Sequence, residues 1–245
     1  MAAEEGFEQE LDRIRKAYAR RAEEGLSSRY SFLAPDHLMA QQDQEKALLR
    51  GLAEARLAAF GRLRVLDVGC GTGSLLLNFL RYGFAAENLH GIDLLEQSVA
   101  CARGRLPSGV TLTVGSATEL PYPDGCYDLV SQYTVFSSVL DEKTARQMAA
   151  EMWRVLAPGG SIIWVDLRRN NPWNPDVRGI PLKEVRGLFP EAACRARRIL
   201  LAPPIARRVA PISAPLARLL GLLPLLRSHL FAMLRKPPPA EEGGR

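Results

Sequence analysis

The chain has 245 residues, a length that fits one α/β domain with additions, or at most two small domains. Its hydrophobic content of 47% is enough for a packed core. The four cysteines form no CxxC pair and no histidine lies at ligand spacing, so neither a disulfide framework nor a metal site is expected. The net charge of +5 is uneven, because residues 178–236 carry twelve Lys and Arg against two Glu.

The first residues, "MAAEEGFEQELDRIRKAYARRAEE", are charged throughout and contain no apolar core of a secretory signal. No uninterrupted apolar run reaches membrane-spanning length. These two features, with thiols that are reduced by default, predict a cytoplasmic protein. The basic C-terminal third is compatible with nucleic acid, anionic lipid or an acidic substrate as a partner, and equally with a solvated basic surface.

Two helices, over 4–24 and 36–60, are expected before the first strand because Ala, Leu, Gln and Glu are prominent there. Strands and helices then alternate, which predicts βαβ units and a doubly wound, mostly parallel sheet of the α/β class. The expected strands are 62–68, 88–93, 109–115, 126–133 and 160–167. The expected helices between them are 74–83, 95–106 and 142–156.

Two further strands are expected in the C-terminal part, over 195–204 and 228–236. The segment between them, 203–227, is interrupted by Pro211, Pro215, Gly221 and Pro224, so it predicts short helical pieces packed over one end of the sheet. The last residues, 237–245, are expected to be disordered. The predicted organisation is an N-terminal helical lid or extension over 1–60 and one domain over 61–236.

A glycine-rich bend, "VLDVGCGTG", follows the first strand and opens the next helix. Glycines 69, 71 and 73 permit positive φ and let a ligand approach the backbone closely. Asp93 ends the second strand, where an acid can accept hydrogen bonds from both ribose hydroxyls of a nucleoside. Asp67 would repel a pyrophosphate but suits an ammonium group. The expected ligand is a nucleoside with a cationic amino acid attached, such as S-adenosylmethionine.

Four segments, "VLDVGCGTG", "GIDLLEQSV", "LPYPDGCYDLV" and "EMWRVLAPGGSIIWVD", resemble the successive motifs of class I S-adenosylmethionine-dependent methyltransferases. They occur in the order of that family and cover about 62–166. The resemblance implies S-adenosylmethionine as the cofactor. It also implies a Rossmann-like methyltransferase fold, a seven-stranded sheet whose last strand runs antiparallel.

The resemblance assigns the methionine part of the cofactor to the bend and the strand before it. Gly69, Gly71 and the Cys70 backbone would line this part, and Asp67 would lie near its amine. Gln132, at the end of the fourth strand, falls where the family also places the amino group.

The adenosine part is assigned to the ends of the second and third strands. Asp93 would hold the ribose and Leu94 would pack on the adenine. Ser116 replaces an acid that many members of the family use for the adenine amine, so the Ala117 backbone is expected to hold the base in part.

The methyl acceptor is less well defined by the sequence. The D/N-P-P-[YF] motif of nucleic-acid amino-methylating enzymes is absent after the fourth strand, which favours a small or lipophilic molecule methylated on oxygen or nitrogen by direct displacement. His37 is the candidate base for a hydroxyl acceptor, Tyr133 a candidate wall of the acceptor site, and Asp166 a candidate for orienting the acceptor.

Alternatives to this function stay open. The chain could instead be an RNA or protein methyltransferase that uses its basic C-terminal region, or a non-catalytic cofactor-binding protein. The apolar insert over 203–227 either walls an acceptor pocket, contacts a membrane surface or simply covers the core. The sequence leaves the identity of the acceptor and the oligomeric state undetermined.

Overall fold

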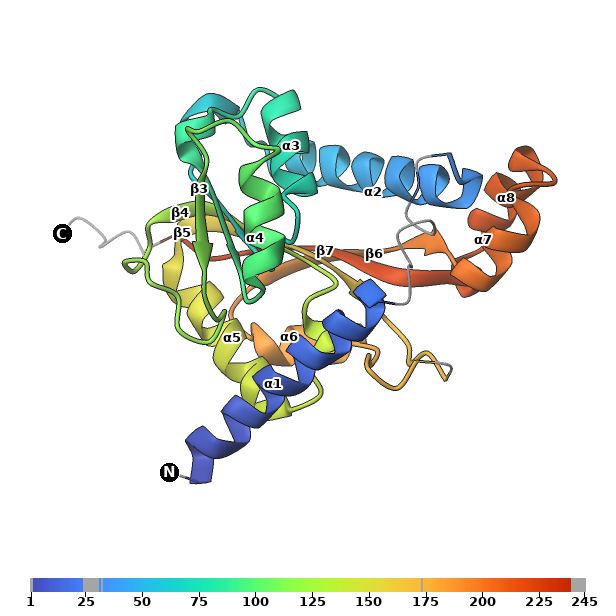
Figure 1. The fold of residues 1–245 in the computed structure, drawn as a ribbon. Coiled ribbons are helices and arrows are strands. Elements are labelled where there is room, and N and C mark those ends of the chain that lie inside the picture. Colours follow the sequence, from blue (N-terminus) through green and yellow to red (C-terminus); the bar gives the residue numbers. More distant parts are fainter. Residues whose placement is uncertain (1, 24–30, 32, 173, 239–245) are drawn as a thin grey trace.

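The computed structural model describes residues 2–23, 31, 33–172 and 174–238. Its centre is a seven-stranded sheet with the strand order β3-β2-β1-β4-β5-β7-β6 (Figure 1). The strands are β1 (Val65–Val68), β2 (Leu89–Asp93), β3 (Thr111–Val114), β4 (Tyr127–Tyr133), β5 (Leu156–Leu167), β6 (Ala193–Leu201) and β7 (Arg227–Arg235). The first five run parallel, whereas β7 runs antiparallel to both β5 and β6. This topology confirms the predicted doubly wound, mostly parallel sheet with an antiparallel last strand.

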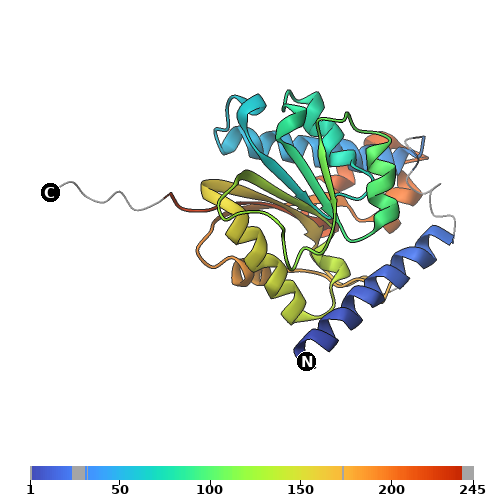
Figure 2. The same cartoon turned by 60° about the vertical axis from the view of Figure 1, so that its left-hand side comes forward.

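Helices cover both faces of the sheet (Figures 1 and 2). The α-helices are α1 (Ala2–Glu23), α2 (Pro35–Glu54), α3 (Ser74–Arg81), α4 (Glu96–Arg103), α5 (Glu142–Val155), α6 (Leu182–Leu188), α7 (Pro203–Val209) and α8 (Ala214–Gly221). Four short 3-10 helices complete the described elements, namely η2 (Phe60–Arg62), η3 (Ala86–Asn88), η4 (Phe136–Ser138) and η5 (Pro224–Leu226). Two apolar clusters fill the layers, one under α2 and α3 and the other under α5 and α6.

Helix α2, which the sequence placed in an N-terminal lid or extension over 1–60, packs in the core. Leu48 and Leu52 are 1% exposed and pack in the same cluster as Val165 and Phe231 of the sheet. A Cβ on Gly51 would lie 2.7 Å from the Phe231 ring, so the helix approaches β7 very closely. Helix α1, by contrast, lies on the outside of the molecule, next to α5 and α6 (Figures 1 and 2). The predicted lid therefore divides into a core helix and a separate N-terminal helix.

The structure departs from expectation at α2, α6 and β5. Helix α2 ends at Glu54 rather than residue 60, and α6 was not predicted. Strand β5 begins at Leu156, so the predicted "APGG" break lies inside a strand, where the register shifts next to Tyr127. Gly160 is needed there because a Cβ would lie 2.8 Å from the Ala157 carbonyl oxygen. Of the tail expected to be disordered, residues 239–245 lie outside the described part of the chain.

The carboxyl ends of β1, β2, β4 and β5 meet at one edge of the sheet, because these strands are parallel and in register. The chain order reverses between β1 and β4, and in open α/β sheets ligands bind at this edge and at this reversal. None of the described helices is long and apolar enough to cross a bilayer.

Candidate functional site

The glycine-rich bend after β1 combines two crowded positions with one open position. Gly69 has φ +69°, and a Cβ there would lie 2.4 Å from a methyl group of Val135. Gly73 has φ +80°, and a Cβ there would lie 2.6 Å from Leu106. Gly71 also has a positive φ, +53°, yet no atom lies within 4 Å of where its Cβ would be. The bend is thus packed at both ends and leaves room for a ligand against the backbone at Gly71.

Asp93 holds this bend from the end of β2. One carboxylate oxygen accepts a hydrogen bond from the Gly71 amide at 2.8 Å, and the other accepts from the Leu95 amide at 2.9 Å. Each oxygen of a carboxylate has a second lone pair, so the group can still accept two hydroxyl donors. Burial raises the pKa of Asp93, and the two amides oppose this effect. Asp93, the residue predicted to bind the ribose, is therefore hydrogen-bonded directly to the backbone of Gly71.

Asp67 is a buried carboxyl group, 3% exposed, at the end of β1. It accepts a hydrogen bond from the Ser131 hydroxyl at 2.7 Å, across the register pair that joins β1 to β4. Burial raises its pKa to about 7, and the nearby charge of Asp93 adds to the shift. Such a group becomes a full anion readily only when a cation lies beside it.

Tyr133 ends β4 next to a strained residue. Its hydroxyl is buried and has no hydrogen-bond partner among the described residues, and burial raises its pKa, with the charge of Asp67 contributing. The hydroxyl is therefore a protonated donor at neutral pH and not a base. Thr134, which follows, has φ +57°, a conformation that β-branched residues rarely adopt. Strain of this kind concentrates at functional sites.

Replacing Tyr133 by phenylalanine will separate binding from stability. The melting temperature should stay unchanged or rise slightly, because an unpaired buried hydroxyl is removed. Cofactor affinity or turnover should fall several-fold, since the hydroxyl is free to donate to a ligand. Tyr82→Phe is the matched control, because the Tyr82 hydroxyl donates to Glu45 at 2.8 Å and its loss should lower stability alone. Unchanged affinity and turnover in Tyr133→Phe would remove this residue from the site.

The side chains of Gln132 and Asp166 form hydrogen bonds with backbone groups of the protein. Gln132 is 0% exposed, accepts from the Val135 amide at 3.1 Å and donates to the Val165 carbonyl at 3.4 Å. Asp166 is also 0% exposed and accepts from the Ser137 and Leu167 amides at 3.1 and 2.8 Å. Both side chains thus brace the segment after β4. The contacts of Gln132 with the cofactor and of Asp166 with an acceptor stay predictions.

On the adenine side of the predicted site, the Ser116 side chain also has hydrogen-bond partners within the protein. The Ser116 hydroxyl lies 2.6 Å from that of Thr118 and accepts from the Thr118 amide at 3.3 Å. Leu94 and Ala117 are half-buried and remain available as apolar walls. Cys70 is buried, and burial raises the pKa of its thiol, so it stays protonated and serves as packing.

His37 lies in the first turn of α2. Its ring is 3.5 Å from the Gln41 amide nitrogen, and burial lowers its pKa against the opposing charge of Asp36. Ala40, one turn later on the same side of the helix, packs against the cluster that contains Cys70 and Tyr133. No recorded contact within the described part of the chain joins His37 to Asp93, Tyr133 or Asp166.

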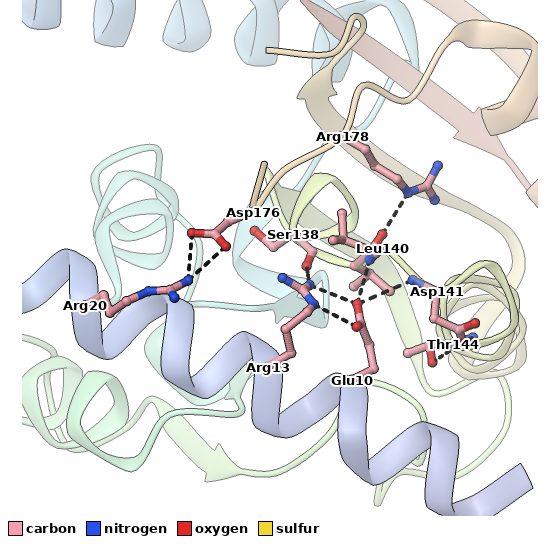
Figure 3. A network of polar contacts seen from close by, with 10 residues as sticks. Glu10, Arg13, Arg20, Ser138, Leu140, Asp141, Thr144, Asp176 and Arg178 are labelled. Atoms are coloured by element: carbon pink, nitrogen blue, oxygen red, sulfur yellow. Dashed lines mark hydrogen bonds and ion pairs between the residues drawn. The ribbon is translucent and has the colours of Figure 1, made fainter. Parts of the chain in front are cut away.

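Helix α1 crosses the segments that follow β4 and β5 (Figure 3). The buried Glu10 carboxylate accepts from the Leu140 amide at 2.6 Å and from Arg13 at 2.8 Å. Arg13 also donates to the Ser138 carbonyl, and Arg20 pairs with Asp176 at 3.0 Å. Burial alone would raise the pKa of Glu10, but the hydrogen bonds from Arg13 and Leu140 outweigh it and lower the pKa. The helix is therefore attached to both loops at the carboxyl edge.

Replacing Glu10 by alanine will release α1 from these loops. The Leu140 amide and the Arg13 guanidinium lose their acceptor, which should lower the free energy of unfolding by about 1–3 kcal/mol. Hydrogen–deuterium exchange should become faster in α1 and in 136–141. Asp12→Ala removes an equal charge from the exposed pair with Lys16 at 2.6 Å and should leave exchange unchanged. Equal exchange in the two variants would show that Glu10 does not hold the helix.

Three comparisons with known proteins agree with this arrangement. Residues 65–160 match the family model described as a methyltransferase domain. Norajmaline N-methyltransferase of Rauvolfia serpentina is 34% identical over 113 residues, which are 44% of this chain and 37% of that protein. Demethylmenaquinone methyltransferase of Deinococcus radiodurans is 34% identical over 120 residues, 48% of each chain. The chain thus matches less than half the length of each of these relatives.

The fold has relatives among solved structures. A S-adenosylmethionine-dependent methyltransferase from Thermotoga maritima superposes with a TM-score of 0.62, covering 91% of this chain and 98% of that one at 17% identity. At this identity the likeness shows the fold alone. Together with the methyltransferase-domain model over 65–160, this fold agrees with the resemblance to class I S-adenosylmethionine-dependent methyltransferases.

The residues at the carboxyl edge fit S-adenosylmethionine, the cofactor of this class. The open position at Gly71 gives space for it, Asp93 keeps lone pairs for ribose hydroxyls, and the Tyr133 hydroxyl is an unused donor. Asp67 offers a carboxyl group whose ionisation a cationic amine would favour. Val135 and Ser131, which shape the bend and hold Asp67, were missed from the sequence. The β1–β4 register could have indicated Ser131, whereas no local signal indicates Val135.

Proposed function

We propose that the protein transfers a methyl group from S-adenosylmethionine to an oxygen or nitrogen atom of a small or lipophilic molecule. One observation carries the proposal: an open glycine bend is fastened to Asp93 at the carboxyl edge of the sheet. When bound, the cofactor supplies an electrophilic methyl group on a sulfonium. The matched domain and the names of the two relatives support methyl transfer as the reaction.

The chain's own residues would mainly bind and align. Asp93 holds the bend and accepts hydrogen bonds, Asp67 offers a negative charge to an amine, and Tyr133 donates a hydrogen bond. A direct displacement depends chiefly on alignment of the acceptor atom. For a hydroxyl acceptor a base is also needed, and His37 is suited to this because its lowered pKa keeps the ring neutral at pH 7.

We favour a lipophilic acceptor over RNA or protein because several C-terminal arginines form contacts within the protein. Arg197 pairs with Glu54, and Arg227 donates to the Gly221 and Arg198 carbonyl groups at 2.6 and 2.8 Å. Part of the basic charge therefore supports the fold. The segment between β6 and β7 also exposes several leucines at the edge of the sheet that carries the bend.

The test is transfer of a labelled methyl group to a cell extract separated into lipid, aqueous small-molecule, RNA and protein fractions. We expect label in a lipid or small-molecule fraction, and none with the Asp93→Ala variant. Label confined to RNA or protein would overturn the proposed acceptor class. Unlabelled fractions with normal cofactor binding by calorimetry would indicate a cofactor-binding protein without transferase activity.

A further inference from the structure

The segment between β6 and β7 presents an apolar surface to solvent. Six residues of α8 and its flanks, together called the leucine surface, are between 47% and 86% exposed. They are Ile212, Leu216, Leu219, Leu222, Leu223 and Leu225. Leu216 and Leu219 lie three residues apart on the outer side of α8, and Leu223 follows the end of this helix, while Ala217 is fully buried on the inner side. A helix that is apolar on both sides is expected to be covered on both.

The inner side of this segment is already packed. Ala206 of α7 and Ala217 of α8 form a small cluster with Met39 of α2 and Leu201 of β6. A backbone hydrogen bond of 2.8 Å from the Ala202 amide to the Leu226 carbonyl closes the base of the insert. The leucine surface therefore does not belong to the packed core, and an exposed apolar surface of this kind indicates a binding partner outside this cluster.

Positive charge accompanies the leucine surface. Between Glu191 and Glu241 the chain contains nine Lys and Arg and no Asp or Glu. Arg207, Arg208 and Arg218 are exposed on α7 and α8. Near the base of the insert, Arg168 and Arg198 line a cavity of about 330 Å³, and one buried guanidinium nitrogen of Arg168 has no partner among the described residues. Asp36 of α2 lies 3.9 Å from Arg207, and Asp43 of α2 lies near Arg218, so the surround is mainly rather than wholly basic. An apolar face with a mainly basic surround is complementary to an anionic lipid bilayer.

The topology places this surface at the edge that carries the glycine bend. Strand β6 runs parallel to β5, because both are antiparallel to β7. The insert leaves β6 after Leu201 and enters β7 at Arg227, so it lies at the carboxyl edge with Asp93 and Tyr133. In Figure 1, α7 and α8 project from this end of the sheet, beside the start of α2.

We propose that the leucine surface docks the protein on an anionic lipid bilayer. The leucines enter the interface between headgroups and acyl chains, and the arginines contact lipid phosphates. This surface lies outside the cofactor site and its docking does not require methyl transfer. The further consequence, that a lipophilic acceptor reaches the carboxyl edge directly from the bilayer, rests on the proposed function.

Vesicle co-sedimentation with the full chain tests the proposal. We expect binding to vesicles of equal parts phosphatidylcholine and phosphatidylglycerol, and weak binding to phosphatidylcholine alone. The double variant L219E/L225E should lose binding at least about tenfold, because two apolar contacts become two negative charges. Arg208→Glu should weaken binding about tenfold or more, and added salt should weaken it further.

Two variants outside the insert serve as matched controls. Leu49→Glu alters a leucine of α2 that is 40% exposed, and Lys143→Glu reverses an exposed charge on α5. Both should bind vesicles like the unaltered protein. Equal loss in a control and its matched insert variant would overturn the proposal, since any added negative charge would then suffice.

Other occupants of the surface give distinct results. If the unaltered protein ignores vesicles and sedimentation shows a dimer that L219E/L225E dissociates, a second copy covers the surface and the proposal fails. If the unaltered protein does not bind vesicles and L219E/L225E lowers the melting temperature, another part of the chain covers these leucines and the proposal fails. Cofactor binding, measured in parallel by calorimetry, separates these outcomes from failure of the proposed function.

Discussion

Replacing Asp93 by alanine will weaken S-adenosylmethionine binding by at least about tenfold. Two effects act in the same direction, because the carboxylate that we propose accepts the ribose hydroxyls disappears and the Gly71 amide loses its partner at 2.8 Å. The second effect also loosens the bend on which the cofactor rests. Isothermal titration calorimetry of the full chain measures the change.

Asp128→Ala is the control for the Asp93 variant. Asp128 accepts a hydrogen bond from the Arg64 amide at 2.8 Å, so its loss also removes one carboxylate–amide contact, but at the amino end of β4. We expect a fall in stability comparable to that of Asp93→Ala and no change in cofactor affinity. If both variants bind with the affinity of the unaltered protein, Asp93 does not hold the cofactor.

Replacing Asp67 by asparagine will stabilise the protein at pH 8 and weaken cofactor binding. Burial raises the pKa of Asp67 to about 7, well above the value of about 4 in an unfolded chain. The folded state therefore binds more protons between these values, so stability falls as the pH rises through this window. Each pKa unit corresponds to about 1.4 kcal/mol, and the asparagine avoids a destabilisation of up to a few kcal/mol.

The pH dependence and the cofactor give independent measures of this effect. The gain in melting temperature over the unaltered protein should be present at pH 8 and absent near pH 4. Cofactor binding by the unaltered protein near pH 6.5 should release protons, seen as a dependence of the calorimetric enthalpy on the buffer, and Asp67→Asn should release none.

Asp166→Asn distinguishes a charge effect from a contact effect. Burial also raises the pKa of Asp166, to about 6, but both of its oxygens accept backbone amides. An asparagine keeps only one acceptor oxygen and turns a donor toward the other amide. This variant should be destabilised at pH 8. A gain in stability like that of Asp67→Asn would contradict the bracing role of Asp166.

Polar residues at the strand ends show which contacts can be predicted from the local sequence and which cannot. The acid that ends β2, Asp93, was predicted to face a ribose, and it lies within hydrogen-bond distance of the Gly71 amide. Gln132 and Asp166 stand at equivalent strand ends, yet their side chains are used by the segment after β4. Which backbone amides lie near a strand end depends on a loop of another strand, and no spacing within the sequence encodes that.

Helix α1 illustrates the same limit. Its charge pattern predicts a helix, whereas its attachment depends on Glu10 meeting the Leu140 amide more than a hundred residues away. Exposure is decided in the same way, because the apolar pattern of α8 fits a core helix as well as a surface helix.

By itself the sequence determined the alternation of strands and helices, the glycine bend, the acid at the end of β2 and the class of cofactor. These features depend on neighbours within a few residues, such as the period of apolar side chains and the conformational freedom of glycine. The tertiary structure alone decided that α2 packs in the core, that Gln132 and Asp166 brace a loop and that the leucines of α8 face outward. Burial and the choice of hydrogen-bond partner are long-range properties, set by which distant segments the fold brings together.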